Sequence, residues 1–163
     1  MALVDYFLKV QGIEGESKDH KHKNEIELES WSWSEQQMGT GHSGGGHGAG
    51  KVAGGDFHFT MKVNKASPKL MLACANGEHL KEATLVSRKA GKDQQEFLKI
   101  KFTELLVSSY QTGGSGHADI VPVDQISINF AKMEIEYKEQ NQDGTLGGTT
   151  KAGYDFKANK ALA

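Results

Sequence analysis

Apolar and polar residues alternate with a period of two along much of the chain. In residues 4–10 and 57–63 every second residue is apolar, and the residues between them are mostly polar. A β-strand points successive side chains to opposite faces of its sheet, so this pattern predicts strands that are buried on one face. We therefore expect a mainly β protein.

Three longer segments alternate in the same way but change parity partway. The apolar positions shift by one residue within 26–33, within 98–107 near Glu104 and within 126–137 near Lys132. A regular strand would turn its apolar side to water at such a point, so each shift predicts a β-bulge or a corner. Long strands that bend suit a sheet that curls into a barrel or a tight sandwich, and we favour a small barrel.

One segment carries the signals of a short helix instead. Ser67 is expected to cap its N-terminus, Pro68 to occupy the first helical position, and Asn76 with Gly77 to end it. The apolar run between these signals predicts a buried face on which the thiol of Cys74 is packed. On the pattern alone, such a helix suits the open end of a barrel.

Residues 39–55 are too rich in glycine to hold a strand or a helix by themselves. We expect a long loop there, and loops of this length in compact domains are usually functional or disordered. Residues 45–51 fit the first seven positions of a phosphate-binding P-loop. Val52, however, stands where a serine or threonine must bind magnesium, so nucleotide binding is not expected.

The composition narrows the classes of function. The chain has 163 residues with 19 basic and 21 acidic side chains, and its net charge is -2. This length suits one domain, which we assign to residues 1–163, and the charge balance disfavours nucleic acid or anionic lipid as a partner. The basic run 18–23 is interpreted as a solvated turn. Because the start lacks a basic leader and a long apolar segment, we expect folding in the cytosol and no membrane insertion.

The sequence shows no constellation typical of catalysis or metal binding. His20, His22, His42 and His47 fall in predicted turns, whereas a metal site needs ligands held on rigid elements, so we interpret them as surface side chains. No serine lies in a nucleophile elbow. We expect no catalytic residue, no cofactor and no metal, and hence a protein that is not an enzyme.

Residues 30–34 read Ser-Trp-Ser-Trp-Ser. Alternation places Trp31 and Trp33 on one face and the three serines on the other, and the large aromatic face belongs in a core. The opposite face is small, polar and uncharged. It is either ordinary solvent-facing surface or the wall of a passage.

Several short motifs follow one another in an order that is typical of a known family. They are Gly-Glu-Ser-Lys-Asp at 15–19, Trp-Ser-Trp at 31–33, Gly-Ala-Gly-Lys-Val at 48–52, Ser-Pro-Lys-Leu-Met at 67–71 with Cys74, Arg-Lys-Ala-Gly at 88–91, Val-Ser-Ser at 107–109 before Gly-Gly-Ser-Gly at 113–116, and Asn-Phe-Ala at 129–131. In their order and spacing, which cover nearly the whole chain, the sequence resembles the Hcp family, the tube proteins of bacterial type VI secretion systems.

The resemblance implies a small β-barrel built from two β-sheets, with one short α-helix at its side and a long extended glycine-rich loop. It also implies homohexameric rings that stack into a hollow tube. The implied partners are a spike protein of the VgrG type, contractile sheath proteins and effector proteins carried in the channel. Members leave the bacterial cytoplasm without a signal peptide, and we expect no fused toxin domain after the last predicted strand.

The resemblance also assigns roles to particular residues. The glycine-rich loop is expected to contact a neighbouring ring, and Ser32 falls on a strand that helps to line the channel. The polar stretches 58–62 and 99–103 face either solvent or the channel. The alternative function is a stand-alone barrel that binds a ligand with its glycine-rich loop. The residues assigned to ring stacking are Gly39, Thr40, His42, His47, Gly50, Lys51 and Val52.

Overall fold

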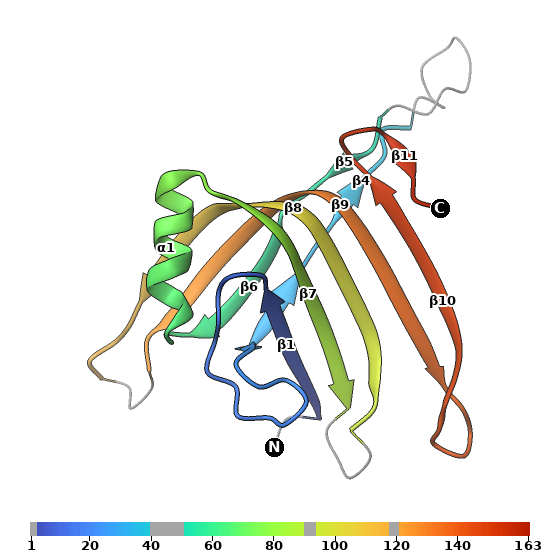
Figure 1. The fold of residues 1–163 in the computed structure, drawn as a ribbon, viewed down its shortest axis with the longest axis horizontal. Helices are drawn as coiled ribbons and strands as arrows, with labels where there is room; N and C mark the ends of the chain where they lie inside the picture. The colour runs from blue at the N-terminus through green and yellow to red at the C-terminus, as the bar shows by residue number, and fades with distance from the viewer. Residues whose placement is uncertain (1–2, 40–50, 90–93, 118–120) are drawn as a thin grey trace.

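The computed structural model describes residues 3–39, 51–89, 94–117 and 121–163, and strands dominate it (Figure 1). The fold is mainly β, as the alternating pattern predicts, with one helix in the described residues. Its elements are β1 (Val4–Val10), β2 (Ile26–Leu28), β3 (Ser30–Ser32), β4 (Glu35–Gln36), β5 (Ala53–Gly54), β6 (Phe57–Lys62), α1 (Ala66–Asn76), β7 (His79–Lys89), β8 (Glu96–Gly113), β9 (Val123–Gln140), β10 (Leu146–Asp155) and β11 (Lys160–Ala161).

The strand pairings trace a barrel-like circuit. Strand β1 pairs with β2 and β7, β7 with β8, β8 with β9, β9 with β6, and β6 with β3, all antiparallel. Strands β2 and β3 follow each other along the chain on either side of Glu29, so this short segment joins the two ends of the circuit. The Glu29 amide donates to the carbonyl of Thr60 at 2.9 Å. Strands β10 and β11 extend the sheet outward from β9.

The long strands β8 and β9 bend and thereby belong to both halves of the barrel. The first half of β9 pairs with β6 and its second half with β10. Phe102 and Leu105 on β8 are both buried, which confirms the predicted change of parity. Glu104 between them has a φ of 58°.

The change of parity is a corner and not a bulge. Thr103 of β8 faces Lys132 of β9, so both strands shift at the same level and their register is kept. The register shift between these strands lies further on, between Val107 and Ser109. A change of parity on one strand alone would need an extra residue in that strand, which is a bulge. Here both strands change parity at the same level, so the pairing between them continues without an extra residue.

The barrel is filled by aromatic and aliphatic side chains. Phe57 and Phe102 have ring centroids 4.7 Å apart, and Phe102 and Phe130 lie 4.8 Å apart. Such pairs contribute about 0.5–1.5 kcal/mol beyond the burial of their surface. Trp31 and Trp33 pack against this core while the three serines that alternate with them are exposed, as the alternation predicts.

Helix α1 stands beside the sheet, next to β8 (Figure 1). It therefore does not cover an open end, and its position agrees with the family resemblance. Gly77 ends the helix in the left-handed conformation with a φ of 62°, as predicted. Leu70 and Ala73 are buried, whereas Met71 and Leu72 are about half exposed, because a helix turns only every third or fourth residue of an apolar run inward.

The predicted N-cap of the helix is wrong. Ser67 lies inside the first turn, and the side chain of Asn64 accepts a hydrogen bond from the amide of Ala66 at 2.8 Å. In return, the Oγ of Ser67 accepts from the amide of Asn64 at 3.0 Å and donates to the buried carboxylate of Asp124 at 2.5 Å. Ser67 thus fastens the helix to β9, and the N-cap position is Lys65, two residues before Ser67, with Asn64 supplying the side-chain hydrogen bond.

Candidate functional site

An uncharged polar surface covers the outer face of the sheet formed by β3, β6, β9 and β8. Two rows of residues run across these four strands as direct cross-strand neighbours. The first row is Ser30, Thr60, Gln125 and Gln111, and the second is Ser32, His58, Ser127 and Ser109. Neighbours in such rows lie close enough to contact each other, so the rows form a continuous neutral face.

The side chains of this neutral face are held by hydrogen bonds. The hydroxyls of Ser30 and Thr60 are 2.6 Å apart. Beside the rows lies one acidic side chain, Asp56, whose carboxylate accepts from the Ser108 hydroxyl at 2.7 Å and from the Asn129 amide at 2.9 Å. A shallow hollow of about 350 Å³ lies over the rows, and Ser32 is exposed in it.

A second outer face, formed by β7, β8, β9 and β10, is charged instead. Lys101 lies 3.3 Å from Glu82, Lys99 lies 3.8 Å from Glu96, and Lys151 pairs with Glu134. Exposed pairs of this kind contribute at most about 1 kcal/mol each, so their main effect is to alternate charge over the surface. The structure thus separates the two polar stretches: residues 58 and 60 lie with Ser32, and residues 99 and 101 lie on the charged face.

Residues 14–25, which we call the strap, connect β1 to β2 and pack over the outer side of β1. Gly15 lets the strap approach its own end, because a Cβ there would lie 2.5 Å from the carbonyl oxygen of Glu25. His22 of the strap is buried and its ring stacks on Phe7 of β1 with centroids 4.3 Å apart. The interpretation of this run as a solvated turn with surface histidines is therefore wrong for His22, although His20 is exposed.

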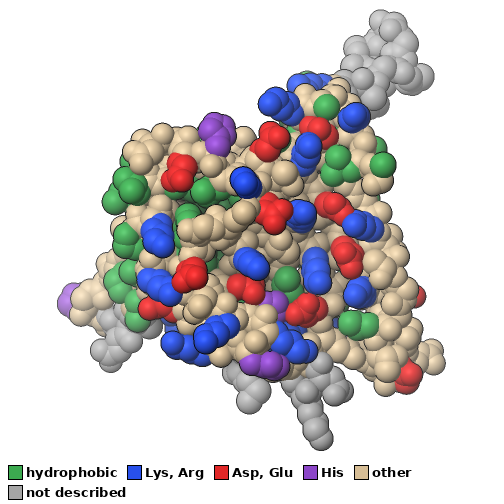
Figure 2. Space-filling model, viewed as in Figure 1, with side chains coloured by type: hydrophobic (Ala, Val, Ile, Leu, Met, Phe, Trp, Pro, Cys, Tyr) green, Lys and Arg blue, Asp and Glu red, His purple; other side chains and the backbone are tan. Residues whose placement is uncertain are grey.

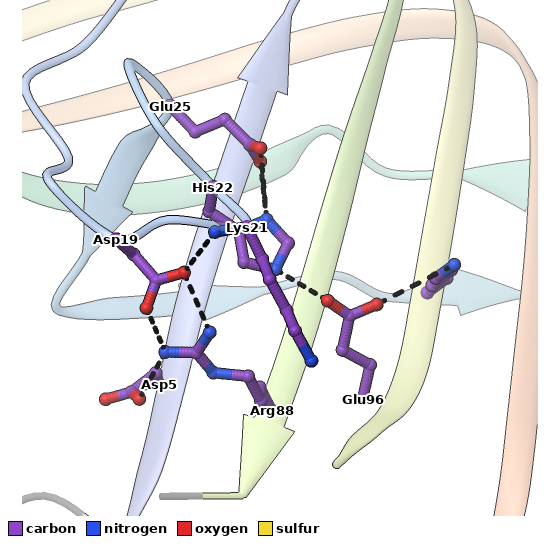
Figure 3. Close-up of polar contacts among 8 residues, drawn as sticks. Asp5, Asp19, Lys21, His22, Glu25, Arg88 and Glu96 are labelled. Atoms are coloured by element: carbon purple, nitrogen blue, oxygen red, sulfur yellow. Dashed lines mark hydrogen bonds and ion pairs between the residues drawn. The ribbon is translucent and has the colours of Figure 1, made fainter. Parts of the chain in front are cut away.

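Two charged clusters fasten the strap (Figure 3). The buried guanidinium of Arg88 on β7 donates to both oxygens of Asp19, at 3.0 and 2.8 Å, and to Asp5 at 3.2 Å. His22 lies between two carboxylates, with Nδ1 3.0 Å from Glu25 and Nε2 2.7 Å from Glu96. Asp19 and His22 of the strap are thus bound to Arg88 of β7 and Glu96 of β8, which anchors the strap.

The Arg88 cluster also perturbs the ionisation of its members. The hydrogen bonds from Arg88 hold the pKa of the Asp19 carboxyl well below its usual range, against the opposing effect of burial. Asp19 in turn raises the pKa of Arg88. Sequence reasoning did not find this pair because its members are 69 residues apart. The only signal was that both lie within motifs of the family resemblance.

The comparisons with known proteins agree with one another. Residues 7–137 match the family model described as "Type VI secretion system effector, Hcp". The chain is 44% identical over 158 residues to the Protein hcp1 of Pseudomonas aeruginosa, which covers 96% of this chain and 97% of that protein. The chain belongs to the Hcp family. It is thus a type VI secretion protein of the class that the sequence resemblance indicated.

Solved structures of Hcp proteins share its fold. The crystal structure of Hcp1 from Salmonella typhimurium has a TM-score of 0.83 at 42% identity, and the match covers 99% of this chain and 100% of that chain. A structure titled as a type six secretion system protein has a TM-score of 0.92 at 31% identity, covering 97% and 99%. An effector structure from Yersinia pestis has a TM-score of 0.74 at 34% identity, covering 93% and 99%.

In this Hcp-family chain the predicted stacking loop is described only at its ends. Gly39 and Lys51 are exposed and Val52 is half-buried. Residues Thr40, His42, His47 and Gly50 lie outside the described residues.

The base of this loop is closed by the pairing of β4 with β5. Gly54 and Gly55 fit this base closely, because a Cβ would lie 2.8 Å from the ring of Phe156 and 2.9 Å from the carbonyl oxygen of Ser34, respectively.

The structure of this Hcp-family chain places no membrane-spanning helix among its described residues. Within the same residues, no three histidine, cysteine, aspartate or glutamate side chains are arranged as a metal site. Cys74 is half-buried beside the core.

Proposed function

We propose that this chain forms homohexameric rings that stack into the hollow tube of a type VI secretion system. The observation that carries the proposal is the neutral face on β3, β6, β9 and β8. Hydroxyl and amide groups stay hydrated and bind neither acidic nor basic proteins strongly. Such a face lines a channel well, because cargo of either charge can move along it without being held.

The second part of the proposal concerns stacking. The loop whose base is closed by β4 and β5 reaches the next ring, and the contacts come from the residues assigned to it from the sequence, Gly39 to Val52. A glycine-rich loop loses much conformational entropy when it settles on a partner, so each contact is weak and stacking stays reversible. Stacking therefore depends on six such loops acting together in one ring.

The third part concerns partners and route. Effector proteins travel in the channel, a VgrG-type spike protein caps the tube, and contractile sheath proteins drive it outward. The chain starts in the bacterial cytoplasm and leaves without a signal peptide. Membership of the Hcp family supports each of these roles, and the role is structural and not enzymatic.

The proposal is tested by the mass of the purified protein in solution. Light scattering after size-exclusion chromatography should give six times the mass of one chain, and negative-stain microscopy of the same fraction should show rings. A monodisperse monomer at high concentration would contradict the proposal and favour a stand-alone barrel that binds a ligand with its glycine-rich loop.

A further inference from the structure

A cleft beside the strap carries an excess of positive charge. It has a volume of about 760 Å³ and is lined by Lys9, Lys21, Lys23 and Lys69 together with His20. We call this hollow the basic cleft. All four lysines are exposed, and none of them forms an ion pair within the described part of the chain.

The carboxylates that line the same cleft do not neutralise these lysines. Glu14 pairs with Lys65 at 3.4 Å, and Glu25 is bound to His22. Four lysines against two carboxylates leave the basic cleft with an excess of positive charge, even though the whole chain carries a net charge of -2. Figure 2 shows lysine or arginine side chains gathered around a histidine at the lower edge of the molecule.

The strap that bears two of these lysines is held in place. Asp19 and His22 point inward to Arg88 and Glu96, while Lys21 between them points away (Figure 3). Lys21 and Lys23 are both exposed. Anchoring on both sides fixes the backbone beneath the lysines. A fixed array of like charges costs less entropy to bind than a loose one, so this surface is suited to an acidic partner.

The same chain carries a protruding surface of the opposite sign. The tip of the hairpin that joins β9 to β10, residues 139–146, exposes Glu139 at the end of β9 and Asp143 in the turn; we call it the acidic hairpin. Neither forms an ion pair within the described residues. Hydrogen bonds from the hydroxyl and amide of Thr145 hold the pKa of the Asp143 carboxyl below its usual value, so that side chain stays charged.

The two surfaces cannot meet within one chain. In Figure 1 the acidic hairpin projects beyond β8 at the lower right, whereas the strap lies beside β1 at the same lower end. Surfaces at one level but on different sides of a subunit meet when copies are related by rotation about an axis, as in a ring. We infer that the acidic hairpin of one copy docks in the basic cleft of its neighbour, an inference that rests on the proposed ring.

Charge reversal at each surface tests this contact. The double variants Lys21→Glu with Lys23→Glu, and Glu139→Lys with Asp143→Lys, each place like charges against each other. Each should weaken ring formation at low salt by at least about tenfold. The matched control is Glu27→Lys with Glu29→Lys, which reverses two exposed glutamates beside a different hollow. The control should form rings as the native protein does.

Mixing the two reversed proteins distinguishes a docking contact from damage to the fold. In a ring of six, alternating copies of the two variants restore an opposite-charge pair at every contact, so the mixture should regain the ring mass. A single chain that carries all four reversals should also form rings. In a mixture of the control with the Lys21→Glu, Lys23→Glu variant, only the control should enter rings and the variant should stay small, which excludes simple attraction between proteins of opposite net charge.

Three outcomes would overturn the inference. The first is that both reversed variants still form rings. The second is that the mixture and the chain with all four reversals both stay below the mass of a ring. Either outcome would show that the two surfaces do not meet. The third is that the Lys21→Glu, Lys23→Glu variant keeps its rings but loses the native protein's binding to a short single-stranded DNA. That result would make the basic cleft a site for polyanions. A native protein that forms no rings contradicts the proposed function instead, and sedimentation of the two reversed variants together then tests the pairwise contact by itself.

Discussion

Single side chains fasten distant parts of this protein to one another. Arg88 joins the strap to β1 and β7, and Asp124 joins helix α1 to the barrel. Arg88 is a buried charge paired with carboxylates, and Asp124 is a buried carboxyl group held by two hydroxyl groups; buried groups of this kind destabilise a fold unless they are bound. The consequences of breaking each pair can therefore be stated residue by residue.

Replacing Arg88 with methionine should lower the free energy of unfolding by about 3–5 kcal/mol, because Asp19 loses its partner in a largely buried position. Urea denaturation followed by tryptophan fluorescence measures this. Lys101→Met is the control, because its ion pair with Glu82 is about half exposed and should cost no more than about 1 kcal/mol. Equal losses in the two variants would contradict the anchoring role of Arg88.

The same cluster predicts a dependence on pH. The pKa of Asp19 is lower in the folded protein than in the unfolded chain, so the stability that this group contributes is complete above the usual pKa of an aspartate. It is lost as the pH falls from there toward the folded pKa. The difference in stability between the native protein and Asp19→Asn, measured by urea denaturation, should therefore shrink as the solution is made acidic. A stability difference that grows as the pH falls would contradict the assignment of this pH dependence to Asp19.

Asp124 should matter through the groups it binds. It is fully buried and accepts hydrogen bonds from Ser67 and from the Tyr110 hydroxyl at 3.1 Å. Asp124→Ala should cost about 2–4 kcal/mol, because two buried hydroxyls lose their partner. Tyr110→Phe removes only one donor and should cost about 1 kcal/mol. Thermal unfolding would show which variant loses more stability. If Tyr110→Phe is as destabilising as Asp124→Ala, the role given to Asp124 is wrong.

Among the elements, the bent strands β8 and β9 decide the architecture. Their corner lies at Glu104, which adopts a left-handed conformation that favours glycine. The side chain is exposed and, within the described residues, forms no hydrogen bond or ion pair that would compensate for this strain.

Glu104→Gly should therefore raise the free energy of unfolding, by about 0.5–1 kcal/mol. Lys101→Gly, three residues earlier in an ordinary part of the same strand, should lower it. Chemical denaturation of the two variants gives opposite signs if the corner is strained as described. Destabilisation by both would mean that the Glu104 side chain contributes more than its backbone costs.

Most of the strands and corners could be predicted from the sequence. The features that were predicted wrongly or missed have physical reasons. Alternation revealed the strands and both corners because the core selects apolar residues on one face. The cap at Asn64 was missed because Ser67 has the right side chain but uses its hydroxyl for Asp124. The burial of His22 was missed because its partner Glu96 is 74 residues away, and no local pattern encodes such a contact.

At the scale of the whole molecule, the proposed function depends on the separation of the neutral face from the charged face. The sequence placed Ser32 opposite the tryptophans but could not say which of the other polar stretches shared its face. That depends on which strands pair, and the pairing of β3 with β6 places residues 58 and 60 beside it. The assignment of this face to a channel stays a prediction.

Ser32→Glu tests that assignment. The position is exposed, so the fold should be unchanged, but a ring would then carry six added negative charges around its channel. We expect rings that keep the native mass but retain acidic cargo proteins less well and basic ones better, as measured by co-purification. Thr149→Glu, on β10, is the matched control and should change neither. An equal effect from both substitutions would show that Ser32 does not face the channel.

The corner in β8 and β9 also determines how this protein carries mechanical load. Each strand runs for 18 residues from the charged face to the neutral face, so the two walls share one backbone ladder, with a single register shift between Val107 and Ser109. Ladder hydrogen bonds lie perpendicular to the strands. A force along the strands therefore loads many of these hydrogen bonds at once and cannot break them one after another. A force applied to the charged face reaches the neutral face through the covalent backbone of β8 and β9.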